Sequence, residues 1–370
     1  MIKILLTSDI HLGIKSDNPP IPEEERINSF NRITKFAKEH DLLLIAGDLF
    51  DNTNIDGNIL DLVSKEFMYL RENNVEIICI PGENELNSYG SIPDFFLNLN
   101  LSHLFSDLDY SPFTYEKNQQ KIFIYGLPAS KKIDISKIKR VSEKGFHIGM
   151  FHANFIFQDY NDIKNIYKFT SQDVKSLNLD FYALGHHHQF KLYKSHDQII
   201  GAYPGSSEAT SYEENGNRYA LSVIISNNEI KQIKGLIVNS VIIKETIIDC
   251  NKYKDPNEIY KILEDNKSSN MIIKIILKGK RNFKFDYNII DEYKKKYLNL
   301  VFSDKSQPSI DFLIEEYQNE NSLRGEFFNL LQEKIANDEI PKQIDIDKLS
   351  EILNQSAKNG LYSPEDWLCK

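Results

Sequence analysis

The sequence has few cysteines and no long apolar run. Its only cysteines, Cys79, Cys250 and Cys369, are scattered over the 370 residues, which excludes a dense disulfide framework. Free cysteines favour a reducing compartment, so we expect a cytoplasmic protein. No apolar run comes close to the length of a membrane-spanning helix, which is about 20 residues. The first run is interrupted by Asp9 and His11 and is too short for a signal peptide, so the sequence predicts no membrane contact.

An excess of positive charge is also missing. The net charge is −10 at pH 7, whereas DNA-binding domains are more often basic because phosphates repel an acidic surface. This balance argues against autonomous, high-affinity binding to nucleic acid. It still allows an enzyme whose metal ions or partner supply the positive charge.

Short apolar runs alternate with amphipathic stretches over the first 190 residues. One amphipathic stretch places Ile27, Phe30, Ile33 and Phe36 at helical spacing. The apolar runs predict strands at IKILLTSD, DLLLIAGDLFD, VEIICIPGENE, KIFIYGLP, FHIGMFHAN and DFYALGHHH. This alternation predicts an α/β fold with a mostly parallel sheet covered by helices. In such folds the chemistry gathers in loops beyond the carboxyl ends of the strands.

The rest of the sequence changes pattern twice. Residues 198–234 predict antiparallel strands with an Asn-Asn turn at 227–228. Residues 251–310 alternate between helix and strand, and residues 311–370 are helical in pattern. We therefore expect one large domain over residues 1–250, followed by a small α/β domain and a helical segment.

Polar residues that can bind metal ions stand at the end of one predicted strand after another. They are Asp9, His11, Asp48, Glu83, Asn84, Glu85, His152, His186 and His188. Carboxylates, imidazoles and an amide oxygen together suit a borderline divalent ion such as Mn²⁺, Fe²⁺ or Zn²⁺. A single Asp-x-His or Gly-Asp is common by chance, but the whole set in this order predicts a metal site.

The three consecutive histidines belong to this pattern. Two residues apart on an extended stretch, His186 and His188 point the same way, as do Asp9 and His11. Each pair can therefore hold one centre, with His187 on the opposite side. Asp48 has enough charge to bridge two cations.

Several stretches resemble the calcineurin-like metallophosphoesterases: KILLTSDIHLG, LLLIAGDLFD, PGENE, FHAN and ALGHHHQF. YPGSS at 203–207, followed by RYALSVIIS, is similar to the SbcD-type DNA repair exonucleases within that family. The resemblance implies a metallophosphoesterase β-sandwich flanked by helices over residues 1–250. It further implies a small α+β capping domain over 251–310 and C-terminal partner-binding helices over 311–370.

The family resemblance also implies a site and a reaction. It implies two divalent ions, with Mn²⁺ as the first choice, that hydrolyse a phosphodiester as an exonuclease or endonuclease. By position, one ion is assigned to Asp9, His11, Asp48 and His188. The other ion is assigned to Asp48, a residue of the PGENE turn, His152 and His186.

The PGENE turn departs from the family pattern, which reads Gly-Asn-His-Asp/Glu. Aligned without a gap, Glu83 takes the place of the metal-binding Asn, and Asn84 takes that of the catalytic His. With one residue looped out, Asn84 is the ligand and Glu85 stands at the position of the His. We favour the gapless register, but both leave Asn84 and Glu85 as the catalytic candidates and remove the histidine. General acid–base assistance is worth about 10²–10⁴ in rate, so we expect weakened or lost activity.

The partners that the resemblance implies are DNA, an SMC-like coiled-coil ATPase of the SbcC type, and a second copy of the chain. Leu323, Phe327, Leu330 and Leu331 form one face of a predicted helix, a pattern typical of a helix that lies in a partner's groove. Packing within its own domain explains the same pattern. Two other functions stay open: an inactive subunit that docks DNA and the ATPase, and a small-molecule phosphodiesterase.

Overall fold

The computed structural model divides the chain into two compact units, Met1–Ile243 and Lys244–Lys370. The described residues are 1–15, 18–87, 91–106, 110–129, 134–156, 168–196 and 198–337. Within these ranges no helix is long and apolar enough to cross a membrane. The sequence predicts domain boundaries after residues 250 and 310, and this division into two units leaves both as predictions.

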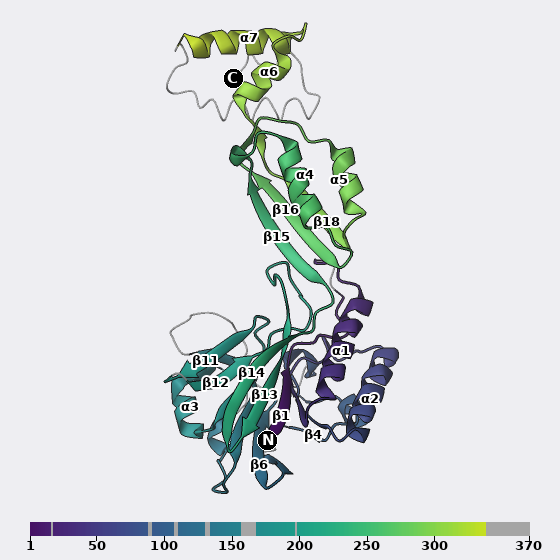
Figure 1. Ribbon diagram of the computed structural model, residues 1–370, viewed down its shortest axis with the longest axis vertical. Helices are drawn as coiled ribbons and strands as arrows, with labels where there is room; N and C mark the ends of the chain where they lie inside the picture. Colours follow the sequence, from purple (N-terminus) through teal and green to yellow (C-terminus); the bar gives the residue numbers. More distant parts are fainter. Residues whose placement is uncertain are drawn as a thin grey trace. The chain divides into compact units, whose positions relative to one another are not determined.

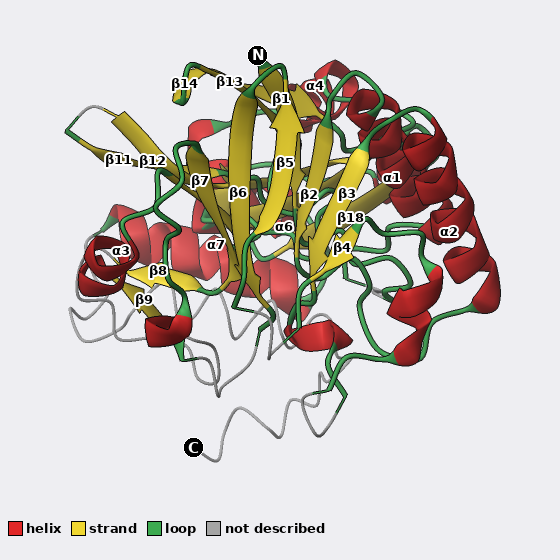
Figure 2. Ribbon diagram, turned by 90° about the horizontal axis from the view of Figure 1, so that it is seen from below, coloured by secondary structure: helices red, strands yellow, loops and turns green. Residues whose placement is uncertain are grey.

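Two six-stranded sheets form the core of the first unit (Figure 2). The first sheet has the order β14 (Glu229–Ile237), β13 (Tyr219–Ser226), β1 (Ile2–Thr7), β2 (Leu42–Ala46), β3 (Glu76–Ile80) and β4 (His103–Leu104). The second has the order β11 (Lys191–Ser195), β12 (Gln198–Tyr203), β10 (Phe181–Gly185), β7 (Phe146–His152), β6 (Gln120–Leu127) and β5 (Phe113–Lys117). The central strands of each sheet run parallel, and antiparallel strands lie toward the edges.

The two sheets face each other across one apolar layer. Successive residues of a strand point to opposite faces, so β1 sends Ile4 into this layer and Leu5 to the other side. Leu44 and Ile78 from the first sheet meet Ile148 of the second sheet in the same cluster. The structure confirms the predicted sandwich of two sheets flanked by helices. Because its central strands are buried on both faces, they have few polar positions.

Helices cover the outer faces of both sheets. Figure 2 shows α1 (Glu23–Ala37) and α2 (Gly57–Glu72) on one side of the molecule, and α3 (Ser171–Leu177) on the other. The helices α1 and α2 pack on the first sheet, α1 through residues such as Phe30 and α2 through Phe67. Asp56 caps α2 because its carboxylate accepts the N–H of Asn58.

One smaller prediction of secondary structure also holds. The strands β13 and β14 form the predicted hairpin, with Asn227 and Asn228 at φ of 55° and 58° in the turn. Asparagine tolerates this left-handed conformation better than most residues. The remaining short elements of the first unit are β8 (Asn154–Ile156), β9 (Lys168–Thr170), and the 3₁₀ helices Glu83–Glu85, Asp94–Asn98 and Ile135–Lys137.

The second unit alternates helices and strands, as its sequence predicts (Figure 1). Its elements are β15 (Ile242–Asp249), the 3₁₀ helix Cys250–Lys252, α4 (Pro256–Asp265), β16 (Met271–Lys278), β17 (Lys280–Arg281), α5 (Tyr287–Lys294), β18 (Asn299–Asp304), β19 (Gln307–Pro308), α6 (Ile310–Tyr317) and α7 (Leu323–Ala336). The main sheet has the order β15-β16-β18, with α4 and α5 packed on it through Ile259, Leu263 and Ile290. Residues 338–370 of the predicted helical segment lie outside the described residues.

Candidate metal centre

The candidate ligands gather where the carboxyl ends of strands from both sheets meet. Asp9 follows β1, Asp48 follows β2, and Glu83 follows β3, all in the first sheet. His152 ends β7 and His186 follows β10, both in the second sheet. The sequence placed each of them at a strand end, and the structure brings these ends together.

The backbones of the two sheets approach each other closely here. A Cβ atom on Gly185 of β10 would overlap the carbonyl oxygen of Ala46 of β2, so only glycine fits. The ring Nδ1 of His152 lies 2.8 Å from the same carbonyl oxygen. A Cβ on Gly82 would overlap the carboxylate of Asp48. The absence of a side chain at Gly185 and Gly82 thus lets the strands that carry the candidate ligands come into contact.

The loops that carry the ligands have an unusual backbone. Asp9, His11 and Asp48 have φ of 50°, 52° and 51°, in the left-handed region that residues other than glycine seldom adopt. Such conformations cluster at functional sites, where the surrounding structure enforces them. The sequence-based assumption that Asp9 and His11 lie on an extended stretch is therefore wrong. These two side chains come together through two left-handed residues, not through strand alternation.

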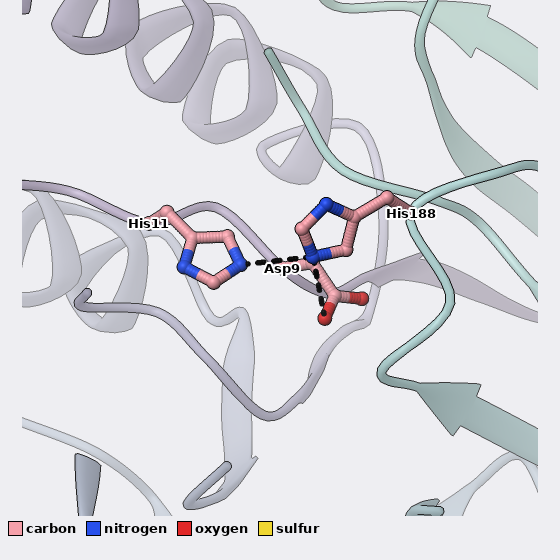
Figure 3. A group of neighbouring side chains, drawn as sticks. All are labelled: Asp9, His11 and His188. Atoms are coloured by element: carbon pink, nitrogen blue, oxygen red, sulfur yellow. Dashed lines mark hydrogen bonds and ion pairs between the residues drawn. The ribbon is translucent and has the colours of Figure 1, made fainter. Parts of the chain in front are cut away.

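The first ligand group consists of Asp9, His11 and His188 (Figure 3). The Nε2 atoms of His11 and His188 lie 3.2 Å apart. The Nε2 atom of His188 lies 3.9 Å from Asp9 Oδ1, and Asp48 Oδ2 is 3.8 Å from His11 Nε2. The ligand atoms of Asp9, His11 and His188 all lie within 4.8 Å of one another, close enough to bind a single ion.

The second ligand group consists of Glu83, His152 and His186. Glu83 Oε1 lies 2.8 Å from His186 Nδ1, and Glu83 Oε2 contacts His152 Nε2. Asp48 Oδ2 is 3.6 Å from His152 Nε2 and so connects the two groups. His186, with φ of 99°, and His188 belong to different groups. The expectation that they share one centre because they point the same way is therefore wrong.

The PGENE turn presents its three polar residues in three different ways. Glu83 is half-buried and faces the histidines, whereas Asn84 is exposed. The Asn84 side-chain amide donates to Asp48 Oδ2 at 2.7 Å. Asn84 therefore stands over Asp48 on the open side of the site.

Glu85 lies on the closed side of the turn and is fully buried. Its carboxylate accepts backbone N–H groups from Gly82, Asp48 and Phe50 at 2.8–3.0 Å. Burial, followed by the charge of Asp48, raises the pKa of Glu85 to about 8. Because its oxygens hold the backbone of two loops, this geometry does not support the prediction that Glu85 is a catalytic residue.

The electrostatics of the second group fit a cation. Burial opposes the charged form of Glu83, but His152 and His186 lower its pKa below the ordinary value. Burial also opposes protonation of His152, yet Asp48 and Glu83 raise its pKa well above the ordinary value. Glu83 Oε2 and His152 Nε2 lie in contact, and neither atom makes a hydrogen bond within the described residues. A divalent ion would satisfy both atoms and replace the proton on His152.

Three of the histidines are held by contacts at the nitrogen that faces away from the site. His11 Nδ1 lies 3.1 Å from Asp51 Oδ1, and His188 Nδ1 lies 3.0 Å from Glu214 Oε1. His152 Nδ1 contacts the Ala46 carbonyl, as described above. Such contacts fix the tautomer that leaves Nε2 free for a metal. Sequence reasoning missed Asp51 and Glu214; GDLFD contains Asp51, but no strand-end signal marks Glu214.

Burial raises the pKa of Glu214, but the contacts of His188, Ser206 and Thr210 lower it further, to about 2.

His187 belongs to neither group, and its ring packs edge-on against Tyr203. Burial, with the charges of His186 and Lys191, lowers the pKa of His187 to about 4.

The predicted partner-binding face on α7 is divided between packing and solvent. Leu331 is buried in a small cluster with Phe328 and α6, and Phe327 packs against that cluster. Leu330 is 52% exposed, while the side chain of Leu323 lies outside the described residues. Packing within the unit therefore accounts for part of this apolar pattern.

Comparison with known proteins identifies the family. A family model described as calcineurin-like phosphoesterase matches residues 2–190. The metallophosphoesterase YhaO of Bacillus subtilis (strain 168) is 25% identical over 295 residues, which cover 74% of this chain and 70% of the relative. The DNA double-strand break repair protein Mre11 of Saccharolobus solfataricus is 27% identical over 312 residues, or 76% of each chain.

A second DNA double-strand break repair protein Mre11, from Methanocaldococcus jannaschii, is 25% identical over 277 residues, covering 71% of this chain and 70% of the relative. The family match extends from before Asp9 to beyond His188 and so includes both ligand groups. The chain therefore belongs to the calcineurin-like phosphoesterases, a family that uses divalent metal ions to hydrolyse phosphoesters.

Proposed function

We propose that this protein is a metal-dependent phosphodiesterase that acts on DNA, as an SbcD-like subunit of a DNA-processing complex. The observation that carries the proposal is the convergence of two carboxylate–histidine groups around Asp48. Two divalent ions bound there, with Mn²⁺ as the first choice, would polarise a phosphodiester and favour attack by water. The Mre11 relatives, named for DNA double-strand break repair, support DNA as the substrate.

In this proposal the ligands divide as the distances do. One ion has Asp9, His11, Asp48 and His188, and the other has Asp48, Glu83, His152 and His186. The contacts of Glu83 with both histidines favour it over Asn84 as the ligand from the turn. This is the register of the turn without a gap.

We further propose that hydrolysis is slow. Asn84 is exposed and contacts Asp48, and its amide can donate a hydrogen bond but cannot release a proton to a leaving alkoxide. A general acid contributes about 10²–10⁴ in rate. Glu83 also adds a negative charge to the site, which reduces the net positive charge that loaded ions present to a phosphodiester.

The test uses the full chain, stripped of metal and titrated with Mn²⁺, and measures cleavage of linear and hairpin DNA. We expect two bound Mn²⁺ ions and slow, Mn²⁺-dependent cleavage that Asp48→Ala abolishes. The proposal fails if wild-type protein binds no Mn²⁺, or if Asp48→Ala cleaves DNA as fast as wild type.

A second candidate function is a subunit that docks DNA and an ATPase without cleaving DNA. The position of Asn84 over Asp48 favours this candidate. Tight DNA binding without cleavage at any Mn²⁺ concentration would support it over the nuclease. Cleavage of cyclic nucleotides, with none of DNA, would instead favour a small-molecule phosphodiesterase.

The proposed partner of the C-terminal helices is an SMC-like coiled-coil ATPase. Leu330 supports this because it remains 52% exposed on α7 while its neighbour Leu331 is buried. Leu330→Asp should prevent co-purification with a co-expressed ATPase and leave the melting temperature unchanged. Co-purification at the wild-type level would count against this partner surface. We also propose a homodimer, which analytical ultracentrifugation of the full chain would detect.

A further inference from the structure

A buried glutamate outside both ligand groups contacts one of the candidate ligands. Glu214 lies in the loop between β12 and β13 and is 6% exposed. Its Oε2 atom accepts from Ser206 Oγ at 2.6 Å and from Arg218 Nη2 at 3.2 Å. Its Oε1 atom accepts from Thr210 Oγ1 at 2.6 Å. Three donors thus fix this carboxylate independently of the metal centre.

The same Oε1 atom faces His188. Its distance to His188 Nδ1 is 3.0 Å, and an ionised carboxylate can only accept, so Nδ1 carries the proton. When the ring is neutral, the other ring nitrogen, Nε2, carries no proton, and it points toward His11 and Asp9. That tautomer is the one a divalent ion binds.

His188 also needs support more than the other histidine of its group. Its side chain is 28% exposed, compared with 4% for His11. Packing therefore restricts the ring of His188 less than that of His11. The contacts of its Nδ1 with Glu214 Oε1 and with Thr210 Oγ1, which lies 2.9 Å away and itself donates to Glu214, restrict its rotation.

We infer that Glu214 is a positioning residue, which holds His188 in the tautomer and orientation that the first ligand group requires. This inference rests on the proposed metal centre. It assigns a role to a loop that carries no proposed ligand, and it treats Arg218 and Ser206 as the anchors of Glu214.

The same loop offers a matched control. Glu208 is also fully buried and accepts at Oε1 from Ser29, Ser240 and the N–H of Val241. It touches no candidate ligand. In Glu208→Gln the amide oxygen can keep these hydrogen bonds, so the variant tests the loss of a buried glutamate without a change at His188.

The experiment measures metal binding by the full chain rather than catalysis. Metal-free wild type, Glu214→Gln and Glu208→Gln are titrated with Mn²⁺ by calorimetry, and bound Mn²⁺ is counted by electron paramagnetic resonance. In Glu214→Gln the amide oxygen should face Arg218, which can only donate, so that the amide N–H₂ faces His188 Nδ1 and can no longer accept its proton. We expect this variant to weaken one of two binding events by about 10–100-fold, the usual effect of losing the partner of a metal-binding histidine. Glu208→Gln should change neither affinity by more than about threefold, within the scatter of independent sites.

Two readouts separate positioning from a general effect on the fold. In a His188→Ala background, Glu214→Gln should cause no further loss of Mn²⁺ affinity, because its effect passes through that ring. In ¹⁵N spectra of the metal-free protein, recorded at a pH at which the His188 ring is neutral, His188 should be the Nδ1–H tautomer in wild type and a mixture in Glu214→Gln. If Glu214→Gln does not fold, Ser206→Ala, which removes a donor to Glu214 Oε2, replaces it, with an expected loss of about threefold or more.

Different failures identify different errors. If wild type binds two Mn²⁺ ions and Glu214→Gln binds both equally well, the inference is overturned and the proposed function stands. An equal loss in the His188→Ala background, or an unchanged tautomer, would also overturn the inference alone. If wild type binds no Mn²⁺, both the proposed centre and the positioning role are overturned.

Discussion

The two ligand groups differ in where their supporting carboxylates lie. In the first group, His11 and His188 are held from behind by Asp51 and Glu214, which are not themselves candidate ligands. In the second group the carboxylate of Glu83 is one of the candidate ligands and contacts both histidines directly. Backbone, in the form of the Ala46 carbonyl, holds the far nitrogen of His152.

This difference separates two ways of strengthening a metal site. Supporting carboxylates fix the tautomer and direction of a histidine without adding charge next to the ion. A carboxylate inside the ligand set adds attraction for the cation, and it also lowers the positive charge offered to a phosphodiester. We therefore expect substitutions to affect the two groups separately, except at Asp48 and at Asp9, whose Oδ1 lies 4.0 Å from His152 Nε2.

Asp48→Ala should remove the distinction between the two ligand groups, because metal binding should be lost at both. Asp48 lies within 4 Å of histidines from each group, so neither ion keeps its full set of ligands. We expect loss of both Mn²⁺ binding events and a fall in hydrolysis of more than about 1,000-fold, since metal ions supply several kcal/mol of transition-state stabilisation. Calorimetry and DNA cleavage check this; wild-type affinity for even one ion would contradict the shared role.

Asn84→His should raise hydrolysis without changing either group. A histidine at this exposed position over Asp48 could donate the proton that the asparagine amide cannot. We expect a gain in kcat of about 100-fold, at the low end of what a general acid contributes. Asn84→Gln, which also lacks a labile proton, is the control and should remain slow. Equal rates for the histidine and glutamine variants would show that Asn84 does not occupy the acid's position.

Glu83→Gln should weaken the second group alone. The carboxylate charge lies next to where that ion would bind, and a unit charge at such range is worth a few kcal/mol at an effective dielectric constant near 20. We expect about 100-fold weaker binding of one Mn²⁺ ion and little change in the other. If both affinities fall together, the two groups are not independent.

Asp51→Asn should give the smallest effect. Asp51 supports His11 as Glu214 supports His188, but its side chain is 26% exposed and that of Glu214 is 7% exposed. Solvent can replace part of an exposed contact. We expect about a tenfold weakening of one Mn²⁺ binding event, at the low end for such partners. A larger loss than that of Glu214→Gln would reverse this ranking.

The strand-end pattern was predictable because each candidate ligand directly follows a buried apolar run. Asp9, Asp48 and His152 can therefore be recognised in the sequence as polar residues at the ends of the apolar runs that form β1, β2 and β7. The hairpin of β13 and β14 was predictable for the same local reason, since its turn is Asn227-Asn228.

What the sequence could not supply depends on contacts between distant segments. Glu214 reaches His188 across 26 residues, and Asp51 reaches His11 across 40, with no local signal for either contact. The left-handed backbone at Asp9 depends on its hydrogen bond to the loop after β2. Likewise, only packing on α6 separates buried Leu331 from exposed Leu330.

The hydrogen bond between His152 and Ala46 joins the second sheet to the first. The His186 N–H, which donates to the Asp9 carboxylate, joins them as well. A cation shared by His152 and Asp48 would add a further link between the two sheets, so metal binding would be coupled to the stability of the entire sandwich. Chelators should accordingly lower the melting temperature of the first unit as a whole, by an amount that follows the logarithm of free Mn²⁺. In this arrangement, metal supply would regulate how long the protein persists as well as how fast it works.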